Sequence, residues 1–226
     1  MVSENIYGSI DEFEAEFKYH GYDCEQIIPG VLLVKNFLTE QDIVDLWEII
    51  NSTTEDGWRK EYLENLVRFC ELKFGRSDVD NLVKEGKFEI TLGWDDKIIA
   101  VHQLEVAKRL TAKIQQVMRR WPDLNIQGWG TVQRQQPGVP LKKHTDVHTD
   151  PSIVYASICY INDDYNDGEI FWAKKDFKMT PKSRSLVIFS GEEEFEHGVR
   201  AVGEGPIRYV LPGFIHKHDF YKKNKF

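Results

Sequence analysis

The sequence predicts an α+β fold in which helices precede and support an all-β half. Two patterns favour this class. Before about residue 120, apolar residues recur at helical spacing, whereas from residue 125 onward short runs rich in Val, Ile, Tyr, Phe and Trp are separated by turn residues. Helices that precede a set of short strands indicate a double-stranded β-helix (jelly-roll) core braced by N-terminal helices.

Helices are expected around Ile10–Lys18, from Thr39 onward, over Trp58–Phe74 and over Ile99–Arg120. The second has the clearest start, because Thr39 can cap the free amides while Asp42 occupies the third helical position. A buried apolar stripe follows at the spacing of one helix face, formed by Ile43, Leu46, Trp47 and Ile50.

The expected strands share β-branched and aromatic content between turn signals. One precedes the second helix, at Gly30–Asn36, and the Asp167-Gly168 pair predicts a tight hairpin turn with positive φ. Residues 75–96 lack periodicity and are expected to form a loop or lid. The strands of the β half are expected at Gly128–Gln133, Ser152–Ile161, Glu169–Trp172, Ser185–Phe189 and Ile207–Ile215.

A chain of 226 residues is long enough for one domain with a sizeable core. We expect residues 28–124 to supply a first strand and helical support, residues 125–216 to form the β-helix, and residues 217–226 to form a basic tail. The formal net charge of -8 argues against a nucleic-acid-binding surface as the main role.

The cysteines indicate the compartment. Cys24, Cys70 and Cys159 are odd in number and show no CxxC spacing, so they form no disulfide framework and favour a reducing interior. No secretion signal or run of about 18 apolar residues is readable, so neither export nor a membrane partner is expected. The expected location is the cytoplasm.

The most informative motif is His144-Thr-Asp146, followed by His197 and then Arg208. Two imidazoles and one carboxylate on one face of an octahedral Fe(II) ion leave three positions open for a co-substrate and dioxygen. The same donors also serve catalytic zinc, but the chain lacks an H-E-x-x-H helix and these ligands fall on expected strands.

A second unit of the same type, His148-Thr-Asp150, follows directly, and either unit has the residue types to bind a metal. The first is preferred because Gly138 precedes it at a glycine turn, whereas the second runs into Pro151. His148 is expected to be exposed or, as the alternative, to face substrate. His102, His216 and His218 have no organised partners in the sequence and are expected to have no catalytic role.

Three segments together resemble the 2-oxoglutarate/Fe(II)-dependent dioxygenases, and within them the prolyl 4-hydroxylase-like branch. The resemblance extends from Ile28 to the C-terminus. It rests on the glycine turn and first iron strand in Pro137-Gly-Val-Pro-Leu-Lys-Lys-His-Thr-Asp146, on Tyr160-Ile-Asn-Asp-Asp with Asp167-Gly-Glu-Ile-Phe-Trp172, and on the distal-histidine segment from His197 to Arg208.

This resemblance implies roles for the motif residues. His144, Asp146 and His197 would hold Fe(II), and Arg208 would pair with the remote carboxylate of 2-oxoglutarate. Tyr160 and Gln135 would complete the co-substrate site, with dioxygen as second co-substrate and ascorbate as a candidate reductant. No further catalytic side chain is assigned.

The chain departs from the family pattern at three places. Gln135 stands where a tyrosine often precedes the glycine turn, and Ala156 stands where a threonine often lines the co-substrate pocket. The interval from His197 to Arg208 is one residue longer than usual, which predicts a bulge or shifted turn between their strands.

The implied function is hydroxylation of a C–H bond, on a peptidyl proline or another amino-acid side chain. A related alternative is hydroxylation of a free small molecule. From a different class, a metal-binding jelly-roll without redox chemistry would act as a sugar-binding or scaffolding module. Arg208 discriminates between an oxygenase and such a module, because a module without redox chemistry needs no 2-oxo acid site. The sequence does not indicate an oligomeric state.

Overall fold

The computed structural model describes residues 7–55, 58–63, 66–72, 90–92, 98–100, 105–127, 132–138 and 140–217. The expectations for His102, His218, the strand start at 128–131 and the tail beyond residue 217 lie outside these residues. So does most of the loop expected at 75–96. Among the described residues, no helix is long and apolar enough to cross a membrane.

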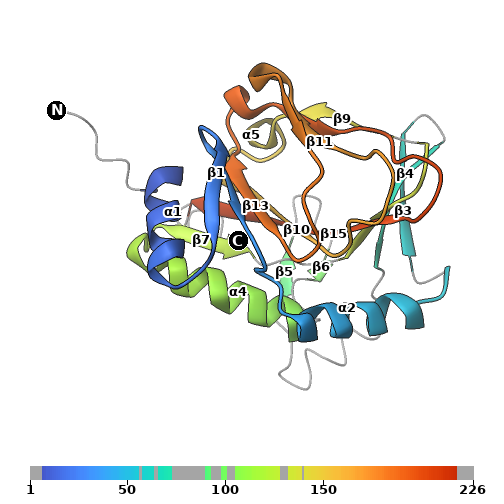
Figure 1. The fold of residues 1–226 in the computed structure, drawn as a ribbon, viewed down its shortest axis with the longest axis horizontal. Coiled ribbons are helices and arrows are strands. Elements are labelled where there is room, and N and C mark those ends of the chain that lie inside the picture. Colours follow the sequence, from blue (N-terminus) through green and yellow to red (C-terminus); the bar gives the residue numbers. More distant parts are fainter. Residues whose placement is uncertain are drawn as a thin grey trace.

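Three helices lie along one side of the molecule, away from β9, β11 and α5 (Figure 1). They are α1 (Ile10–Tyr19), α2 (Glu40–Ser52) and α4 (Glu105–Val117). The predicted capping box of α2 is confirmed: the Thr39 side chain accepts from the Asp42 amide, and the Asp42 carboxylate accepts from the Thr39 amide. Leu46 and Ile50 of the predicted stripe are buried.

The strands form one large and one small antiparallel sheet. The large sheet has the order β1-β2-β13-β10-β15-β8-β4-β3, with β7 also paired to β15, and the small sheet has the order β12-β11-β14-β9. The bounds in the large sheet are β1 Cys24–Ile28, β2 Val31–Val34, β3 Trp58–Leu63, β4 Leu66–Leu72, β7 Leu124–Gln127, β8 Gln133–Gln135, β10 Ile153–Tyr160, β13 Leu186–Ser190 and β15 Arg208–Lys217. Those in the small sheet are β9 Leu141–His144, β11 Ile170–Trp172, β12 Phe177–Met179 and β14 His197–Val199.

From β8 onward, the chain passes back and forth between the two sheets. Strands β8, β10, β13 and β15 belong to the large sheet, and β9, β11, β12 and β14 belong to the small one. This alternation is the winding of a double-stranded β-helix. The predicted α+β fold with such a core is confirmed, and β1 to β4 extend the large sheet on both sides.

Each face of the large sheet has its own apolar core. Side chains from α1, α2 and α4, among them Phe17, Leu46 and Leu110, pack with Leu186 and Leu211 on the outer face. The inner face packs against the small sheet. Its buried cluster contains Val31, Ala156, Tyr160, Ile170, Trp172, Val187, Phe189, Phe195 and Val210. The helices therefore hold the large sheet from outside and leave its inner face available for a site between the sheets.

The helix expected over Trp58–Phe74 is wrong, because this segment forms the hairpin strands β3 and β4. Its apolar residues fit a helical face, but the edge of β8 offers hydrogen-bonding partners. Cys70 pairs with Arg134 there, and Glu71 with Gln133. Tertiary pairing overrides local helical spacing in this segment.

The helix expected over Ile99–Arg120 begins later than predicted. Residues Ile98–Ala100 form β6 against β5 (Ile90–Leu92), consistent with their β-branched content, and α4 starts at Glu105. Its last three residues form the 3₁₀ turn Met118–Arg120. Strand β5 also falls inside the segment that was expected to be a loop. Strand β1 lies in a region expected to be irregular, where it pairs with β2.

Backbone angles and strand register test two predictions about turns. Asp167 and Gly168 both have positive φ, at 52° and 66°, which confirms the predicted turn chemistry. Between His197 and Arg208, the β14–β9 pairing shifts register after His197, and Val202 forms isolated bridges with Pro137 and Asp167. The longer interval is thus accommodated by an irregular connection.

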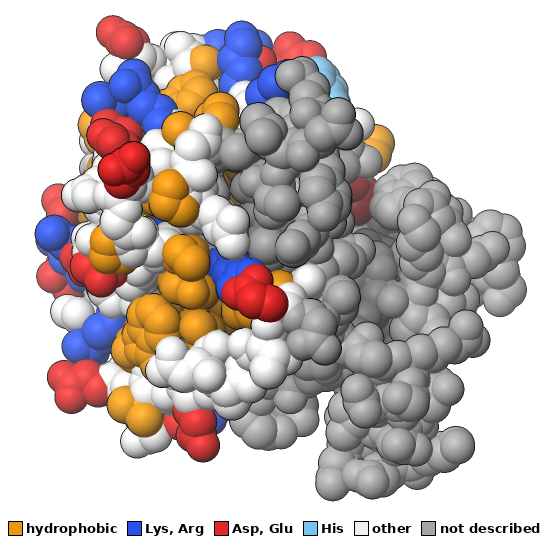
Figure 2. Space-filling model, turned by 90° about the vertical axis from the view of Figure 1, so that its right-hand side faces the viewer, with side chains coloured by type: hydrophobic (Ala, Val, Ile, Leu, Met, Phe, Trp, Pro, Cys, Tyr) orange, Lys and Arg blue, Asp and Glu red, His pale blue; other side chains and the backbone are white. Residues whose placement is uncertain are grey.

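The described surface mixes charges of both signs. On the described part of the face drawn in Figure 2, acidic and basic side chains lie interspersed around a small apolar area. Interspersed charges of this kind give no extended field of one sign there.

Asp42 connects α2 to α4 and gives a prediction about stability. Its carboxylate is 2% exposed and accepts hydrogen bonds from Arg109 at 2.8 Å and from Lys113 at 3.1 Å. Burial alone would raise the pKa of Asp42, but these bonds and that from the Thr39 amide more than offset burial and hold it at about 2. Because this pKa lies below its unfolded value of about 4, the ionised carboxylate stabilises the fold above that pH.

We expect Asp42→Asn to lower the free energy of unfolding at pH 7 by about 3 kcal/mol, because two cations lose a buried partner. The gap between variant and wild type should narrow as the pH falls from about 4 towards 2. Urea unfolding at a series of pH values measures both effects. Asp45→Asn is the control, because Asp45 also binds Arg109 but is partly exposed, and it should cost under about 1 kcal/mol. A difference in unfolding free energy between Asp42→Asn and wild type that did not vary with pH would contradict the lowered pKa of Asp42.

Candidate metal centre and buried arginine

Three polar side chains converge on the inner face of the small sheet. His144 ends β9, His197 begins β14, and these two residues are register partners in the sheet. Asp146 opens the short helix α5 (Asp146–Thr149) directly after β9. One potential ligand atom from each residue lies within 4.8 Å of the others. The Asp146 carboxylate is 3.7 Å from His144 Nε2 and 3.9 Å from His197 Nε2.

Backbone hydrogen bonds fix which ring nitrogen of each histidine faces the centre. Nδ1 of His144 lies 3.0 Å from the Lys142 carbonyl oxygen, and Nδ1 of His197 lies 3.1 Å from the Phe195 carbonyl oxygen. Since a carbonyl only accepts, Nδ1 of a neutral ring carries the proton in both cases. Both Nε2 lone pairs then point to the shared centre, which is the usual orientation of metal-binding imidazoles.

The electrostatics of the cluster suit a divalent cation. Asp146 is 5% exposed, and its Oδ2 has no hydrogen-bond partner. Burial raises the pKa of Asp146 above its ordinary value, and burial followed by repulsion from His144 lowers the pKa of His197. Two neutral imidazoles beside a buried, unpaired carboxylate oxygen form a set of donors that a metal ion would satisfy. The residues therefore fit the ferrous ion that the sequence indicates.

The second H-x-D unit stays outside this cluster. His148 is exposed and lies 3.2 Å from Glu193. Asp150 is buried, but its Oδ1 accepts from the Ser152 amide at 2.8 Å and from the Ser152 hydroxyl at 2.6 Å. The structure thus groups the first unit, and not the second, with His197.

His216 has organised partners, so that part of the sequence-based expectation is wrong. Its Nδ1 lies 2.8 Å from the Ser152 hydroxyl oxygen and 3.6 Å from Asp150 Oδ2. The Asp150 amide also donates to the Asp146 carbonyl at 2.9 Å. This buried network joins the α5 turn to β15. It arises because β15 runs beside the start of β10, a pairing that sequence spacing does not reveal.

Arg208 lies on the inner face of the large sheet and is 4% exposed. It pairs in register with Gln135 of β8, donates to the Gln135 Oε1 at 3.2 Å and to the Tyr160 hydroxyl at 3.4 Å, and stacks on the Tyr160 ring. Its Nε has no hydrogen-bond partner. Gln135 and Tyr160, its hydrogen-bond partners within the described part of the chain, are both neutral, so the buried charge lacks an anion there.

Tyrosine and alanine side chains complete the surroundings of Arg208. Burial raises the pKa of Tyr160 to about 12, so its hydroxyl stays protonated and able to donate. Tyr165, which sequence reasoning did not select, is 6% exposed; burial raises the pKa of its hydroxyl, and the Arg208 guanidinium offsets part of this effect. Ala156 is buried on the same face as Tyr160. It adds no polar group where a threonine would.

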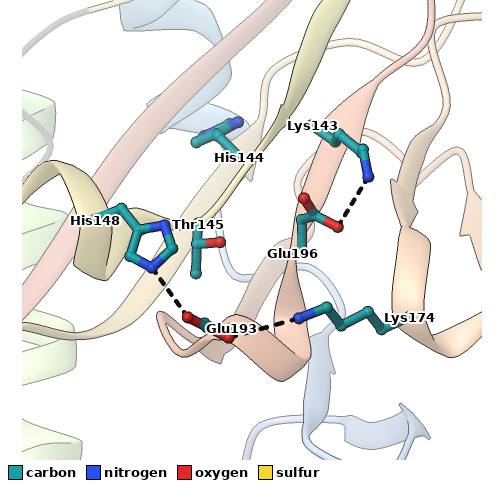
Figure 3. Close-up of a pocket in the computed structure, with 7 residues that line it drawn as sticks. All are labelled: Lys143, His144, Thr145, His148, Lys174, Glu193 and Glu196. Atoms are coloured by element: carbon teal, nitrogen blue, oxygen red, sulfur yellow. Dashed lines mark hydrogen bonds and ion pairs between the residues drawn. The ribbon is translucent and has the colours of Figure 1, made fainter.

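A charged pocket of about 360 Å³ lies on the surface beside His144 (Figure 3). Glu193 joins His148 to Lys174, and Glu196 lies 3.3 Å from Lys143. His144 lies at the edge of the pocket away from Glu193 and Lys174 in this view. The lining residues are Lys143, His144, Thr145, His148, Lys174, Glu193 and Glu196.

Among the solved structures similar to this chain are a 2OG-Fe(II) oxygenase family protein and two prolyl hydroxylases. A prolyl hydroxylase from Trichoplax adhaerens, in complex with a hypoxia inducible factor peptide fragment, is 14% identical with a TM-score of 0.59, covering 87% of this chain and 88% of that one. A Pseudomonas putida prolyl-4-hydroxylase is 16% identical with a TM-score of 0.57, covering 83% and 92%. A 2OG-Fe(II) oxygenase family oxidoreductase from Burkholderia pseudomallei is 10% identical with a TM-score of 0.57, covering 93% and 91%. At these identities the likeness shows the fold.

The family comparison is more specific. No curated protein matches the chain. Residues 130–216 match the model of the 2OG-Fe(II) oxygenase superfamily, and this segment contains the His144, Asp146 and His197 cluster as well as Arg208. The matched segment, together with the convergence of these side chains, makes the β half of the chain similar to the 2OG-Fe(II) oxygenase superfamily.

Proposed function

We propose that this enzyme hydroxylates a C–H bond in an amino-acid side chain, peptidyl proline being the leading candidate. His144, Asp146 and His197 hold Fe(II), and Arg208, Tyr160 and Gln135 bind the remote carboxylate of 2-oxoglutarate. One observation carries this assignment. The space between the two sheets contains both a metal-type cluster with an unpaired carboxylate oxygen and a buried guanidinium with no anionic partner among the described residues.

The metal-type cluster lacks a cation, and the buried arginine lacks an anion. A metal cation would satisfy the Asp146 oxygen, and a dicarboxylate would supply the anion that Arg208 lacks. When bound, Fe(II) supplies the oxidation in which one atom of dioxygen enters the substrate and the other enters succinate, as 2-oxoglutarate loses carbon dioxide.

The chain's own residues contribute orientation and exclusion of water. The carbonyl groups of Lys142 and Phe195 hold both imidazoles with Nε2 turned inward. Phe189 packs edge-on against the His197 ring with centroids 4.5 Å apart. It provides an apolar wall of the large sheet against the metal centre. Gln135 braces Arg208, because its Oε1 accepts from the guanidinium while its amide nitrogen donates to the Arg200 carbonyl.

The substrate assignment draws on the pocket and on the likeness to other structures. Lysine, glutamate and histidine side chains surround the pocket beside His144, which favours a polar substrate such as a peptide over an apolar small molecule. Two structures of the same fold are named prolyl hydroxylases, and one of them is bound to a peptide fragment. A free polar small molecule is the alternative substrate.

The buried Arg208 also argues against a binding module without redox chemistry. A metal-binding jelly-roll without a 2-oxo acid site has no use for a buried guanidinium whose contacts among the described residues are neutral.

We also propose that the chain works as one domain in the reducing cytoplasm, because Cys24 and Cys159 are buried free thiols. Burial raises the pKa of Cys24 to about 11, which keeps it unreactive.

Anaerobic addition of Fe(II) and 2-oxoglutarate to the purified protein tests this function. We expect a weak visible charge-transfer band that appears only with both components, because the 2-oxo acid must chelate the metal. Admitting air should then convert 2-oxoglutarate to succinate, measured by mass spectrometry. A protein that binds Fe(II) but gives neither band nor succinate at saturating 2-oxoglutarate would support the non-redox alternative. Candidate proline peptides then report the substrate through a mass increase of one oxygen atom.

A further inference from the structure

Asp146 differs from the two histidines of the metal-type cluster in how its side chain is held. Backbone carbonyl groups fix both imidazoles, at 3.0 Å from His144 Nδ1 and 3.1 Å from His197 Nδ1. Asp146 Oδ2 is buried and has no hydrogen-bond partner among the described residues. The position of this carboxylate therefore depends on the backbone of α5, the single turn that Asp146 begins. Whatever fixes this turn also fixes the third candidate ligand.

A buried network of side chains anchors the end of this turn. The Asp150 amide closes α5 by donating to the Asp146 carbonyl at 2.9 Å. Asp150 Oδ1 accepts from the amide and the hydroxyl of Ser152, at 2.8 and 2.6 Å, and Ser152 Oγ lies 2.8 Å from Nδ1 of His216 on β15. The side chains of all three network residues are buried. The turn is thus tied through two side-chain hydrogen bonds to the central part of the large sheet.

The chemistry of these groups determines which way each hydrogen bond runs. A carboxylate only accepts, and the Ser152 hydroxyl has a single proton, so at 2.6 Å that proton is donated to Asp150. The Ser152 oxygen then accepts from His216, whose Nδ1 carries the proton. Removing any member leaves a buried polar group of its neighbour unsatisfied, which is why such networks hold one geometry.

The same residue types form the nucleophilic triad of hydrolases, but the order of the groups differs. In a triad, the histidine lies between the serine and the carboxylate. Here Ser152 lies between Asp150 and His216, and its side chain is fully buried, so the hydroxyl does not reach a substrate. This arrangement favours a role in holding the turn.

We propose that Asp150, Ser152 and His216 are positioning residues, which hold the α5 turn against β15 so that the Asp146 carboxylate faces the two metal-binding imidazoles. This inference rests on the proposed function, because it concerns the same metal. It gives a role to part of the second His-Thr-Asp unit: Asp150 supports the ligand of the first unit and does not itself bind the metal.

Titration of Mn(II) into the full-length protein, followed by electron paramagnetic resonance, tests this role without turnover. We expect Ser152→Ala to weaken Mn(II) binding about 10-fold, because hydrogen bonds that orient a metal ligand contribute roughly 10- to 100-fold to affinity. The zero-field splitting of the bound ion should also change, since a displaced Asp146 carboxylate alters the symmetry around the metal. An unchanged Mn(II) affinity would overturn the proposal.

Ser157→Ala is the matched control. The Ser157 side chain is also buried, and its hydroxyl on β10 donates to the Gly213 carbonyl of β15 at 2.9 Å. This bond joins the same two strands but does not involve the α5 turn. Both variants should lower the melting temperature, whereas only Ser152→Ala should weaken Mn(II) binding. An equal loss of affinity in both would show that reduced stability is the cause, and the positioning role would be rejected.

Two substitutions at His216 keep the test decisive if Ser152→Ala does not fold. His216→Asn places an amide N–H where Nδ1 stood, because both nitrogens are bonded to Cγ, whereas His216→Leu occupies similar space without a donor. His216→Asn should stay within about 3-fold of the wild-type Mn(II) affinity, and His216→Leu should lose about 10-fold. Equal affinities in these two variants would contradict the proposal.

The wild-type titration separates this inference from the proposed function. If the wild type bound no Mn(II), the proposed function would fail and the positioning role with it. Normal binding by the wild type together with normal binding by Ser152→Ala rejects the positioning role alone.

Discussion

Replacing His144 with alanine is expected to reduce the affinity for Fe(II) by more than about 100-fold, since even residues that only support a ligand contribute 10- to 100-fold. The imidazole Nε2 faces Asp146 across 3.7 Å, and Nδ1 is held by the Lys142 carbonyl, so no neighbouring group takes its place. Titration of Mn(II) into the protein, followed by electron paramagnetic resonance, measures the affinity directly. Succinate formation should disappear in parallel.

The sequence supplies a matched control for this experiment. His148 belongs to a second His-Thr-Asp unit, but it is exposed and bound to Glu193. His148→Ala should therefore leave the metal affinity unchanged. Loss of metal binding in His148→Ala together with normal binding in His144→Ala would reverse the assignment of the two units, while the class of enzyme would stand.

Replacing Arg208 with glutamine is expected to weaken 2-oxoglutarate binding by about 100-fold or more, because a buried charge-assisted contact to a carboxylate is lost. Metal affinity should stay the same, since the three ligand residues lie on the other sheet or on α5. Calorimetry with the Mn(II)-loaded protein separates the two effects. Arg208→Lys should retain part of the affinity, because it keeps the charge without the planar donor array.

Arg134 provides the control for Arg208. It lies next to Gln135 on β8, is equally buried, and forms an ion pair with Glu55 while stacking on Trp58. Its side chain faces the opposite side of the sheet, because side chains alternate along a strand. Arg134→Gln should therefore reduce stability and leave 2-oxoglutarate affinity unchanged. An equal loss of affinity in both variants would show that the Arg208 effect is a general loss of folding.

Features that depend on local chemistry were predictable from the sequence. The Thr39 cap with Asp42 and the positive-φ pair at Asp167 and Gly168 require only neighbouring residues, and the structure contains both. The order of His144, Asp146, His197 and Arg208 was also informative, because successive strands of the β half bring these positions to one interior. That these residues bind iron and 2-oxoglutarate stays a prediction for the experiments above.

Features that depend on distant pairing were not predictable. The segment Trp58–Phe74 has helical spacing, yet β4 pairs with β8 more than 60 residues later. The partners of His216 are brought to it by the pairing of β15 with the start of β10. Tyr165 sits among turn residues, where nothing in the sequence shows that its side chain is buried. Each case depends on sheet order, which a single sequence does not specify.

The register that pairs His144 with His197 also constrains how this chain can change length. A one-residue deletion inside β9 or β14 would turn one imidazole to the outer face of the sheet, because side chains point alternately to either side. Insertions in the connection from residue 200 to residue 207 should leave the pairing of His144 with His197 intact, because this connection lies between the end of β14 and the start of β15. Natural variants of this protein should therefore differ in length at that connection and keep the two strands free of gaps.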